Sequence, residues 1–223
     1  MGMKLISLNI AQPKTVIIDE LPVLTGIYKL PVKRPVWLAK LGLNGDDQAD
    51  KAVHGGEHQA IYSYPFEHYA YWQDTLGLTD LPYGTFGENL TISGFDEDSI
   101  QIGDTLKIGE AIVQVTMPRI PCFKFGHKIG QPDILETFLN SGRSGFYQRV
   151  ITAGSIKAGD EITLLDREVD SITVRTALIL QKLDLALAAE EPKHLLHKAL
   201  KIPNLAPLLK TVYLERLTAL EQS

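Results

Sequence analysis

The stretch Gly103–Val115, GDTLKIGEAIVQV, contains two strand-length apolar runs, Thr105–Ile108 and Ala111–Val115, that are separated by two residues. A Gly-Asp pair leads directly into the first run, and a second such pair, Gly159-Asp160, stands just before another apolar run. Short β-branched runs bounded by glycine turns are typical of strands. Many such runs in succession favour a sandwich or a barrel over a parallel sheet with long crossover helices.

The same texture extends from Lys4 to about Asp166, so this span is predicted to be mainly β with short helices. Further strand-length runs lie at 5–10, 14–19, 26–30, 36–41, 60–64, 89–92 and 161–165. Two segments have helical character. Pro65–Leu76 opens with proline at a first-turn position and ends before a glycine, and Pro132–Leu139 has the same pattern.

The amino-acid composition changes after about Arg167, where leucine and alanine dominate. Three helix-compatible segments follow, Val174–Ala189, Pro192–Lys201 and Leu205–Leu220. The sequence therefore predicts a β domain over 1–167 and a small all-α region of three helices over 168–223. Three short helices bury little surface by themselves, so we expect them to dock on the β domain or on a partner.

Composition places the chain among ordinary globular proteins. Of its 223 residues, 44% are hydrophobic and 22% are charged. The 22 Lys and Arg residues face 27 Asp and Glu residues, a net charge of -5, which argues against binding a nucleic-acid polymer. No apolar run is long enough for a signal peptide or a membrane span, and we expect a cytoplasmic protein without a membrane partner.

The single cysteine, Cys122, stands in the segment Met117–Lys128, MPRIPCFKFGHK. Arg119 and Lys124 flank it, and nearby cations favour the thiolate, which is both a nucleophile and a soft metal ligand. The two prolines of the segment predict a rigid loop that leaves the sheet. A lone cysteine is often a small buried hydrophobe, and that alternative remains open at this point.

Two histidines, His54 and His58, stand four residues apart in HGGEH. The two glycines between them argue against a helix and therefore against the HExxH zinc motif, and they favour a tight turn or a close approach of backbone to a ligand. The chain also lacks GxGxxG, GxxxxGK[ST] and GxSxG. Any redox chemistry is therefore expected to take electrons from another protein.

Four motifs occur together in this chain: GDDQADKAVHGG at 45–56, FGENL at 86–90, PRIPC at 118–122 and GFYQRVITAGSIKAGD at 145–160. In this order they resemble the MOSC domain, named for the C-terminal domain of molybdenum-cofactor sulfurase. The resemblance runs from about Lys4 to Leu165. The segment Asp170–Leu217 is similar to the three-helix extension of a bacterial branch that confers resistance to hydroxylaminopurine, an N-hydroxylated base.

The resemblance implies a closed, strongly curved β-barrel of the MOSC and pyruvate-kinase-barrel type. It also implies a molybdenum cofactor, molybdopterin, with Cys122 as the catalytic residue and the protein ligand to the metal. The positions that match the family motifs and are expected to bind the cofactor are Lys29, His54, His68, Asn89 and Arg119.

The activity implied by the resemblance is a molybdenum-dependent reduction of N-hydroxylated compounds, such as hydroxylaminopurine, to the amine. One cysteine cannot hold an iron–sulfur cluster of its own, so a flavin or iron–sulfur reductase is expected as the electron donor. Two alternatives remain. In one, the protein is a non-catalytic carrier of sulfur or of the cofactor through Cys122. In the other, it is a zinc hydrolase with His54, His58 and Cys122 as ligands.

Overall fold

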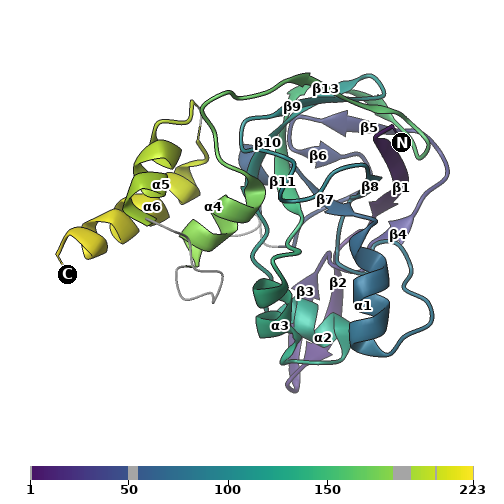
Figure 1. Cartoon of the computed structure of the whole chain (residues 1–223). Helices are drawn as coiled ribbons and strands as arrows, with labels where there is room; N and C mark the ends of the chain where they lie inside the picture. The colour runs from purple at the N-terminus through teal and green to yellow at the C-terminus, as the bar shows by residue number, and fades with distance from the viewer. Residues whose placement is uncertain (1, 50–54, 183–191, 204, 223) are drawn as a thin grey trace.

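The computed structural model describes residues 2–49, 55–182, 192–203 and 205–222, and the chain is mainly β with helices (Figure 1). The strands are β1 (Lys4–Ile10), β2 (Lys14–Ile18), β3 (Leu21–Thr25), β4 (Leu30–Pro31), β5 (Val36–Ala39), β6 (Gly42–Leu43), β7 (Ile61–Pro65), β8 (Leu90–Ser93), β9 (Thr105–Ile108), β10 (Ala111–Pro118), β11 (Phe146–Thr152), β12 (Gly154–Ile156) and β13 (Ile162–Asp166). The main sheet has eight strands in the order β13-β9-β10-β11-β7-β8-β1-β4. A three-stranded sheet, β12-β5-β6, and the hairpin β2-β3 accompany it.

The two apolar runs between Thr105 and Val115 form the β9-β10 hairpin, whose register pairs Ile108 with Ala111 and Leu106 with Val113. Gly103, just before β9, has φ of 94°, a left-handed conformation that glycine adopts without steric cost. β10 continues past this hairpin to pair with β11, and its last residue, Pro118, lies opposite Phe146. The chain therefore leaves the sheet after Pro118, the first residue of the PRIPC motif.

The closed barrel implied by the family resemblance is not confirmed by the strand pairing. The sheet order ends at β13 on one side and at β4 on the other. An isolated bridge between Lys4 and Glu161, and a hydrogen bond from the Leu5 amide to the Asp160 carbonyl (2.9 Å), join β1 to the segment before β13. The sheet is therefore curved enough for strands near its two ends to meet, but no continuous ladder of the described residues closes it.

Three short helices, α1 (His68–Leu76), α2 (Phe123–Ile129) and α3 (Ile134–Ser141), gather beside the β2-β3 hairpin (Figure 1).

The sequence predicted a helix that starts at Pro65. This start is wrong, because Pro65 ends β7 and pairs with Ile92 of β8. The sequence predicted a rigid loop in the segment Met117–Lys128, whereas α2 begins at Phe123. Gly126 disfavours a helix by propensity, but a Cβ at this position would lie 3.2 Å from the Pro132 carbonyl oxygen, so tight packing favours glycine.

The C-terminal region contains α4 (Val174–Gln181), α5 (Pro192–Leu200) and α6 (Pro207–Glu221), on one side of the main sheet (Figure 1). The part of the first predicted helix from 183 to 189 lies outside the described residues. Buried residues of these helices, such as Ala177 and Leu209, belong to the same hydrophobic cluster as Leu106 and Val113 of the sheet. The helices therefore share a core with the sheet, and the domain boundary at residue 167 stays a prediction. Within the described ranges, no helix combines the length and hydropathy needed to cross a membrane.

A second hydrophobic cluster lies beside the first and is mostly aromatic. This aromatic cluster consists of Tyr62, Tyr64, Tyr69, Trp72, Leu81, Phe86, Phe125, Ile134 and Phe138. Its rings stack closely, with centroids 4.3 Å apart for Tyr64 and Phe86. Because α1, α2 and α3 all contribute residues to it, the cluster holds these helices together at one end of the molecule.

Candidate functional site

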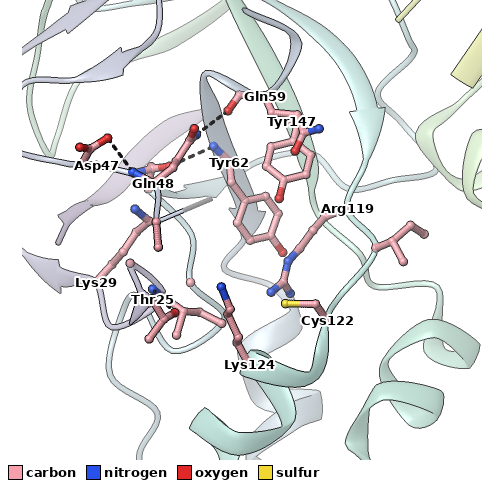
Figure 2. Close-up of a pocket in the computed structure, with 16 residues that line it drawn as sticks. Thr25, Lys29, Asp47, Gln48, Gln59, Tyr62, Arg119, Cys122, Lys124 and Tyr147 are labelled. Carbon is pink, nitrogen blue, oxygen red and sulfur yellow. Dashed lines mark hydrogen bonds between the residues drawn. The ribbon is translucent and has the colours of Figure 1, made fainter. Parts of the chain in front are cut away.

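A cavity lies where the end of β3, the loop before β8 and the segment between β10 and α2 come together (Figure 2). The lining residues are Thr25, Gly26, Ile27, Lys29, Asp47, Gln48, Ala49, Gln59, Tyr62, Gly87, Asn89, Arg119, Ile120, Cys122, Lys124 and Tyr147. Four residues that the sequence singled out therefore line one cavity, namely Lys29, Asn89, Arg119 and Cys122. They come from three motifs or segments that are far apart along the chain.

Cys122 stands at the N-terminal cap of α2, with an extended backbone (φ -116°, ψ 172°). Its carbonyl accepts a hydrogen bond from the Phe125 amide (2.8 Å), so the first turn of the helix fixes its position. The side chain is half-buried, and its sulfur lies beside the guanidinium of Arg119 in the cavity (Figure 2). A cation next to a thiol favours the thiolate, so this position suits a metal ligand or a nucleophile.

Arg119 is buried against aromatic rings, with 5% of its surface exposed. Its guanidinium carbon lies 5.1, 4.9 and 5.5 Å from the ring centroids of Tyr62, Phe125 and Phe138. These cation–π contacts orient the guanidinium but do not neutralise its charge. The aromatic cluster therefore carries a positive charge on its cavity side.

The charge of Arg119 is retained despite its burial. Burial disfavours the protonated form, but the interactions with Tyr62, Tyr147 and Cys122 outweigh it, and the pKa of Arg119 is raised above its ordinary value. Its Nη1 atom is buried and has no hydrogen-bond partner in the described parts of the chain. A buried donor without a partner is unfavourable. The guanidinium of Arg119 as a whole lines the cavity, where a cation of this kind suits a charge-assisted hydrogen bond to an anion.

The wall opposite Arg119 contains a buried ion pair. Lys29 Nζ lies 2.5 and 2.7 Å from the two carboxylate oxygens of Asp46, and the two side chains are 8% and 7% exposed. Asp46 also accepts hydrogen bonds from the Ala11 amide (2.7 Å) and from Asn89 Nδ2 (2.8 Å). Asn89 Oδ1 in turn accepts from the Tyr62 amide (3.2 Å). Asp46 therefore fixes the positions of Lys29 and Asn89 together.

Two lysines of α2 connect the Cys122 side of the cavity to the segments facing it. Lys124 Nζ donates to the Leu24 carbonyl (3.1 Å), and Lys128 Nζ donates to the carbonyls of Ile27 (2.8 Å) and Gly84. Burial is the main cause that lowers the pKa of Lys128 to about 8. The helix that begins after Cys122 is thus tied to both the β2-β3 hairpin and the loop before β8.

Two of the predicted site residues are not in the described cavity wall. His68 Nε2 lies 2.6 Å from Glu97 Oε2, and the other oxygen of this fully buried carboxylate accepts from the Gly145 amide (2.6 Å). The structure therefore places His68 in a buried pair that anchors α1, and it gives no support to a role in cofactor binding. His54 lies outside the described residues.

The zinc alternative also finds no support in the described residues. They contain no group of three or more His, Cys, Asp or Glu side chains arranged to hold a metal ion. His58 contributes its carbonyl to a hydrogen bond from Thr116 Oγ1 (2.6 Å), and burial lowers the pKa of its imidazole. The ligand set that includes His54 stays untested, since His54 is not described.

Asp46, Tyr62 and Tyr147 were not singled out from the sequence, whereas Lys128 belongs to the cation-rich segment Met117–Lys128. Asp46 stands in the GDDQADKAVHGG motif and Tyr147 in the GFYQRVITAGSIKAGD motif. Neither motif indicated a cavity, because Asp46 lies 43 residues before its hydrogen-bond partner Asn89. Asp46 and Tyr147 reach the cavity region only because strands far apart in the sequence pair in the sheet.

Comparison with known proteins agrees with this geometry. The MOSC domain matches residues 50–163. The chain belongs to the MOSC domain family. The MOSC match includes both Arg119 and Cys122 of the cavity.

The MOSC relatives include YiiM and YflK proteins. The chain is 40% identical over 172 residues to the uncharacterized protein YflK of Bacillus subtilis, covering 77% of each chain. It is 38% identical over 157 residues to protein YiiM of Escherichia coli, covering 69% of each chain. A fungal protein of Gibberella moniliformis named "Reductase" is 35% identical over 146 residues, which are 64% of this chain and 26% of that protein.

A solved MOSC relative matches almost the whole chain. The crystal structure of YiiM from Geobacillus stearothermophilus has a TM-score of 0.79 and 31% sequence identity, and it covers 96% of this chain and 99% of that one. The chain therefore has a YiiM-like fold.

Proposed function

We propose that this protein binds a molybdenum cofactor in the cavity and reduces N-hydroxylated compounds, such as hydroxylaminopurine, to the amine. The observation that carries the proposal is the half-buried sulfur of Cys122 beside Arg119, whose buried Nη1 has no hydrogen-bond partner in the described residues. A thiolate is a soft metal ligand, and a guanidinium without a carboxylate partner among the described residues suits the anionic group of a phosphate-bearing cofactor. The chemistry of these two side chains therefore fits the cofactor that the MOSC family implies.

In this proposal Cys122 is the protein ligand to the metal, and Arg119 binds the anionic part of the cofactor. Asn89 and Lys29 form the wall across the cavity, where Asp46 holds them in place. When bound, the cofactor supplies the two-electron redox chemistry that breaks an N–O bond. The chain supplies the position of the ligand, the electrostatics and the enclosure.

The cavity walls also suit a planar, polar substrate. Tyr62 and Tyr147 have ring centroids 5.4 Å apart and present aromatic surface to the cavity. Gln48 and Gln59 also line the cavity, and the side-chain amide of Gln48 donates from Nε2 to the backbone carbonyl of Gln59 (2.9 Å). An N-hydroxylated base combines an aromatic ring with polar edges, so it matches both kinds of lining residue.

The proposed reaction needs a partner. Conversion of an N-hydroxylamine to the amine consumes two electrons and two protons and releases water. With one cysteine, the chain cannot hold an iron–sulfur cluster on its own thiolates, so the proposal includes a separate flavin or iron–sulfur reductase as the electron donor. The name of the fungal relative supports an oxidoreductase role, although the match spans only 26% of that protein.

The first test is the metal and pterin content of the protein made in a host that synthesises the cofactor, measured beside Cys122→Ser. We expect molybdenum and pterin near one per chain in the parent protein and loss of molybdenum in the variant. The substitution changes little volume, so both proteins should show the same melting temperature when free of cofactor. The loaded parent should reduce hydroxylaminopurine with a chemical reductant, and the variant should be inactive.

Two results would overturn parts of the proposal. Neither molybdenum nor pterin in the parent, from a host in which another molybdoenzyme is filled, would refute the cofactor site. Bound cofactor without reduction of N-hydroxylated compounds would refute the reductase activity and favour the carrier alternative.

A further inference from the structure

A second cavity, of about 390 Å³, lies between the start of α1 and the loop that precedes β8. Its walls come from the stretches Phe66–Gln73 and Asp80–Tyr83, and we call it the α1 pocket. None of its lining residues also lines the cavity that contains Cys122. The volume lies within the range of small-molecule sites, about 300 to 1,000 Å³. The α1 pocket is therefore a separate candidate binding site.

Three aromatic rings converge on the α1 pocket. The ring centroids of Phe66, Tyr69 and Tyr83 lie 5.7 to 6.2 Å from one another, and the ring planes make angles of 30°, 62° and 67°. The Tyr69 hydroxyl donates to the fully buried carboxylate of Glu88, so this side chain offers its ring and not its hydroxyl to the pocket. Rings that meet at an angle around a hollow form an aromatic cage, which attracts a cation through their negative faces.

The charged groups of the α1 pocket are carboxylates. Glu67 and Asp80 line it, and its described lining residues include no Lys, Arg or His. Neither carboxylate has a cation within salt-bridge distance in the parts of the chain that the structure describes. Glu67 accepts a hydrogen bond from the Gly94 amide (2.8 Å), which holds its carboxylate beside the pocket. The pocket therefore offers negative charge next to its aromatic rings.

The two walls of the α1 pocket are fastened to each other. Gln73 Nε2 of α1 donates to the Thr79 carbonyl of the loop (3.3 Å). Glu88, which accepts from Tyr69 of α1, also accepts from the Gly84 amide of the loop (2.7 Å). A site whose walls are already in place loses less conformational entropy on binding than one that a ligand must order.

We propose that the α1 pocket binds a quaternary ammonium group. Such a group carries its positive charge beneath methyl groups, so aromatic faces and carboxylates both attract it. A primary ammonium is strongly hydrated and loses more on leaving water. Glu67 and Asp80 repel a second carboxylate, so the pocket favours a cation over a zwitterion. Two sources present this group, namely a free molecule such as choline and a trimethylated lysine of a partner protein.

The experiment titrates the isotope-labelled full chain with choline and follows the backbone amide shifts by NMR. We expect saturable shifts that are confined to the two walls of the α1 pocket. The neutral isostere dimethylbutanol, in which carbon replaces the ammonium nitrogen of choline, should bind more than about tenfold more weakly. A peptide that contains trimethyllysine is titrated in parallel, and the tighter of the two cationic ligands identifies the source.

Variants of the pocket test the rings and the carboxylates separately. Tyr83→Leu should weaken choline binding about fivefold, whereas Tyr83→Phe keeps the ring and should stay within about twofold of the parent. The double variant Glu67→Gln/Asp80→Asn should weaken choline binding about tenfold. Asp74→Asn is the matched control, since it removes an exposed carboxylate of α1 that does not line the pocket. It should leave the choline affinity unchanged.

The proposal is overturned if dimethylbutanol binds as tightly as choline, because the pocket would then recognise shape and not charge. It is also overturned if choline does not shift the amides of the pocket, or if the double variant binds choline as tightly as Asp74→Asn does. The Tyr83→Phe protein distinguishes loss of the ring from loss of the fold. These measurements do not involve Cys122 or a bound cofactor, so their outcome is independent of the proposed function.

Discussion

The two walls of the cavity both contain a buried cation, but they stabilise it in different ways. On one wall, Lys29 is paired with Asp46 at 2.5 and 2.7 Å. On the other wall, Arg119 rests on aromatic rings and keeps an unpartnered Nη1 among the described residues. The first arrangement is complete without a ligand and serves to hold the wall. The second is incomplete without one, which is the property expected of a binding group.

The largest expected loss of stability comes from removing Lys29 from its ion pair with Asp46. Lys29→Met should lower the free energy of unfolding by about 3 kcal/mol or more, because it leaves the buried Asp46 carboxylate without its counter-charge. Urea unfolding of the cofactor-free chain measures this change. The exposed pair Lys40–Glu57 provides the control, and Lys40→Met should lower the free energy of unfolding far less than Lys29→Met does. Equal costs for the two substitutions would show that the Asp46 pair does not hold the wall.

An effect of intermediate size on the free energy of unfolding is expected from Lys128, whose ammonium group donates hydrogen bonds to backbone carbonyls. Burial lowers the pKa of Lys128 to about 8 from 10.5, so between these values the unfolded chain binds more protons than the folded one. The contribution of Lys128 to the free energy of unfolding should therefore rise from about pH 8 to about pH 10.5, by about 1 to 3 kcal/mol. Below pH 8 it should be constant.

The measurement is the difference in unfolding free energy between the parent and Lys128→Met across this pH range. Taking the difference removes the contributions of other lysines and tyrosines that titrate in the same range. A difference that stays flat from pH 8 to pH 10.5 would contradict the lowered pKa of Lys128.

The smallest effect on stability is expected at Arg119. Arg119→Met should change the free energy of unfolding of the cofactor-free chain by less than about 1 kcal/mol, because relief of the buried charge offsets the lost cation–π contacts. The same substitution should abolish cofactor retention. A destabilisation as large as that of Lys29→Met would mean that Arg119 mainly stabilises the fold. The proposed difference between the two walls would then be wrong.

Much of the site was accessible from local sequence. The prolines around Arg119 and Cys122 predicted that the chain leaves the sheet there, and β10 does end at Pro118. The Gly-Asp turn before Thr105 predicted the start of a strand, and β9 begins at that residue. These predictions succeeded because each depends on the conformational limits of glycine and proline within a few residues.

The rest depended on contacts between distant segments. Helix α2 was not predicted, because Gly126 has a low helix propensity, which close packing against Pro132 overrides in the structure. The role of Asp46 follows from Lys29 and Asn89 reaching it across the sheet. The pairing of His68 with Glu97 brings together residues 29 positions apart, and the role of His68 in cofactor binding stays a prediction. Side-chain type alone does not distinguish a histidine in such a pair from a ligand.

The aromatic cluster gives the protein an internal optical reporter. Trp72 is fully buried in the cluster, whereas Trp37, the other tryptophan, is 48% exposed. Trp72 donates a hydrogen bond to Tyr64 Oη (2.6 Å) and stacks on Phe138, one of the rings beneath Arg119. In a Trp37→Phe protein, the emission of Trp72 would follow the packing under the guanidinium directly, so occupancy of the cavity becomes visible by fluorescence without any added dye.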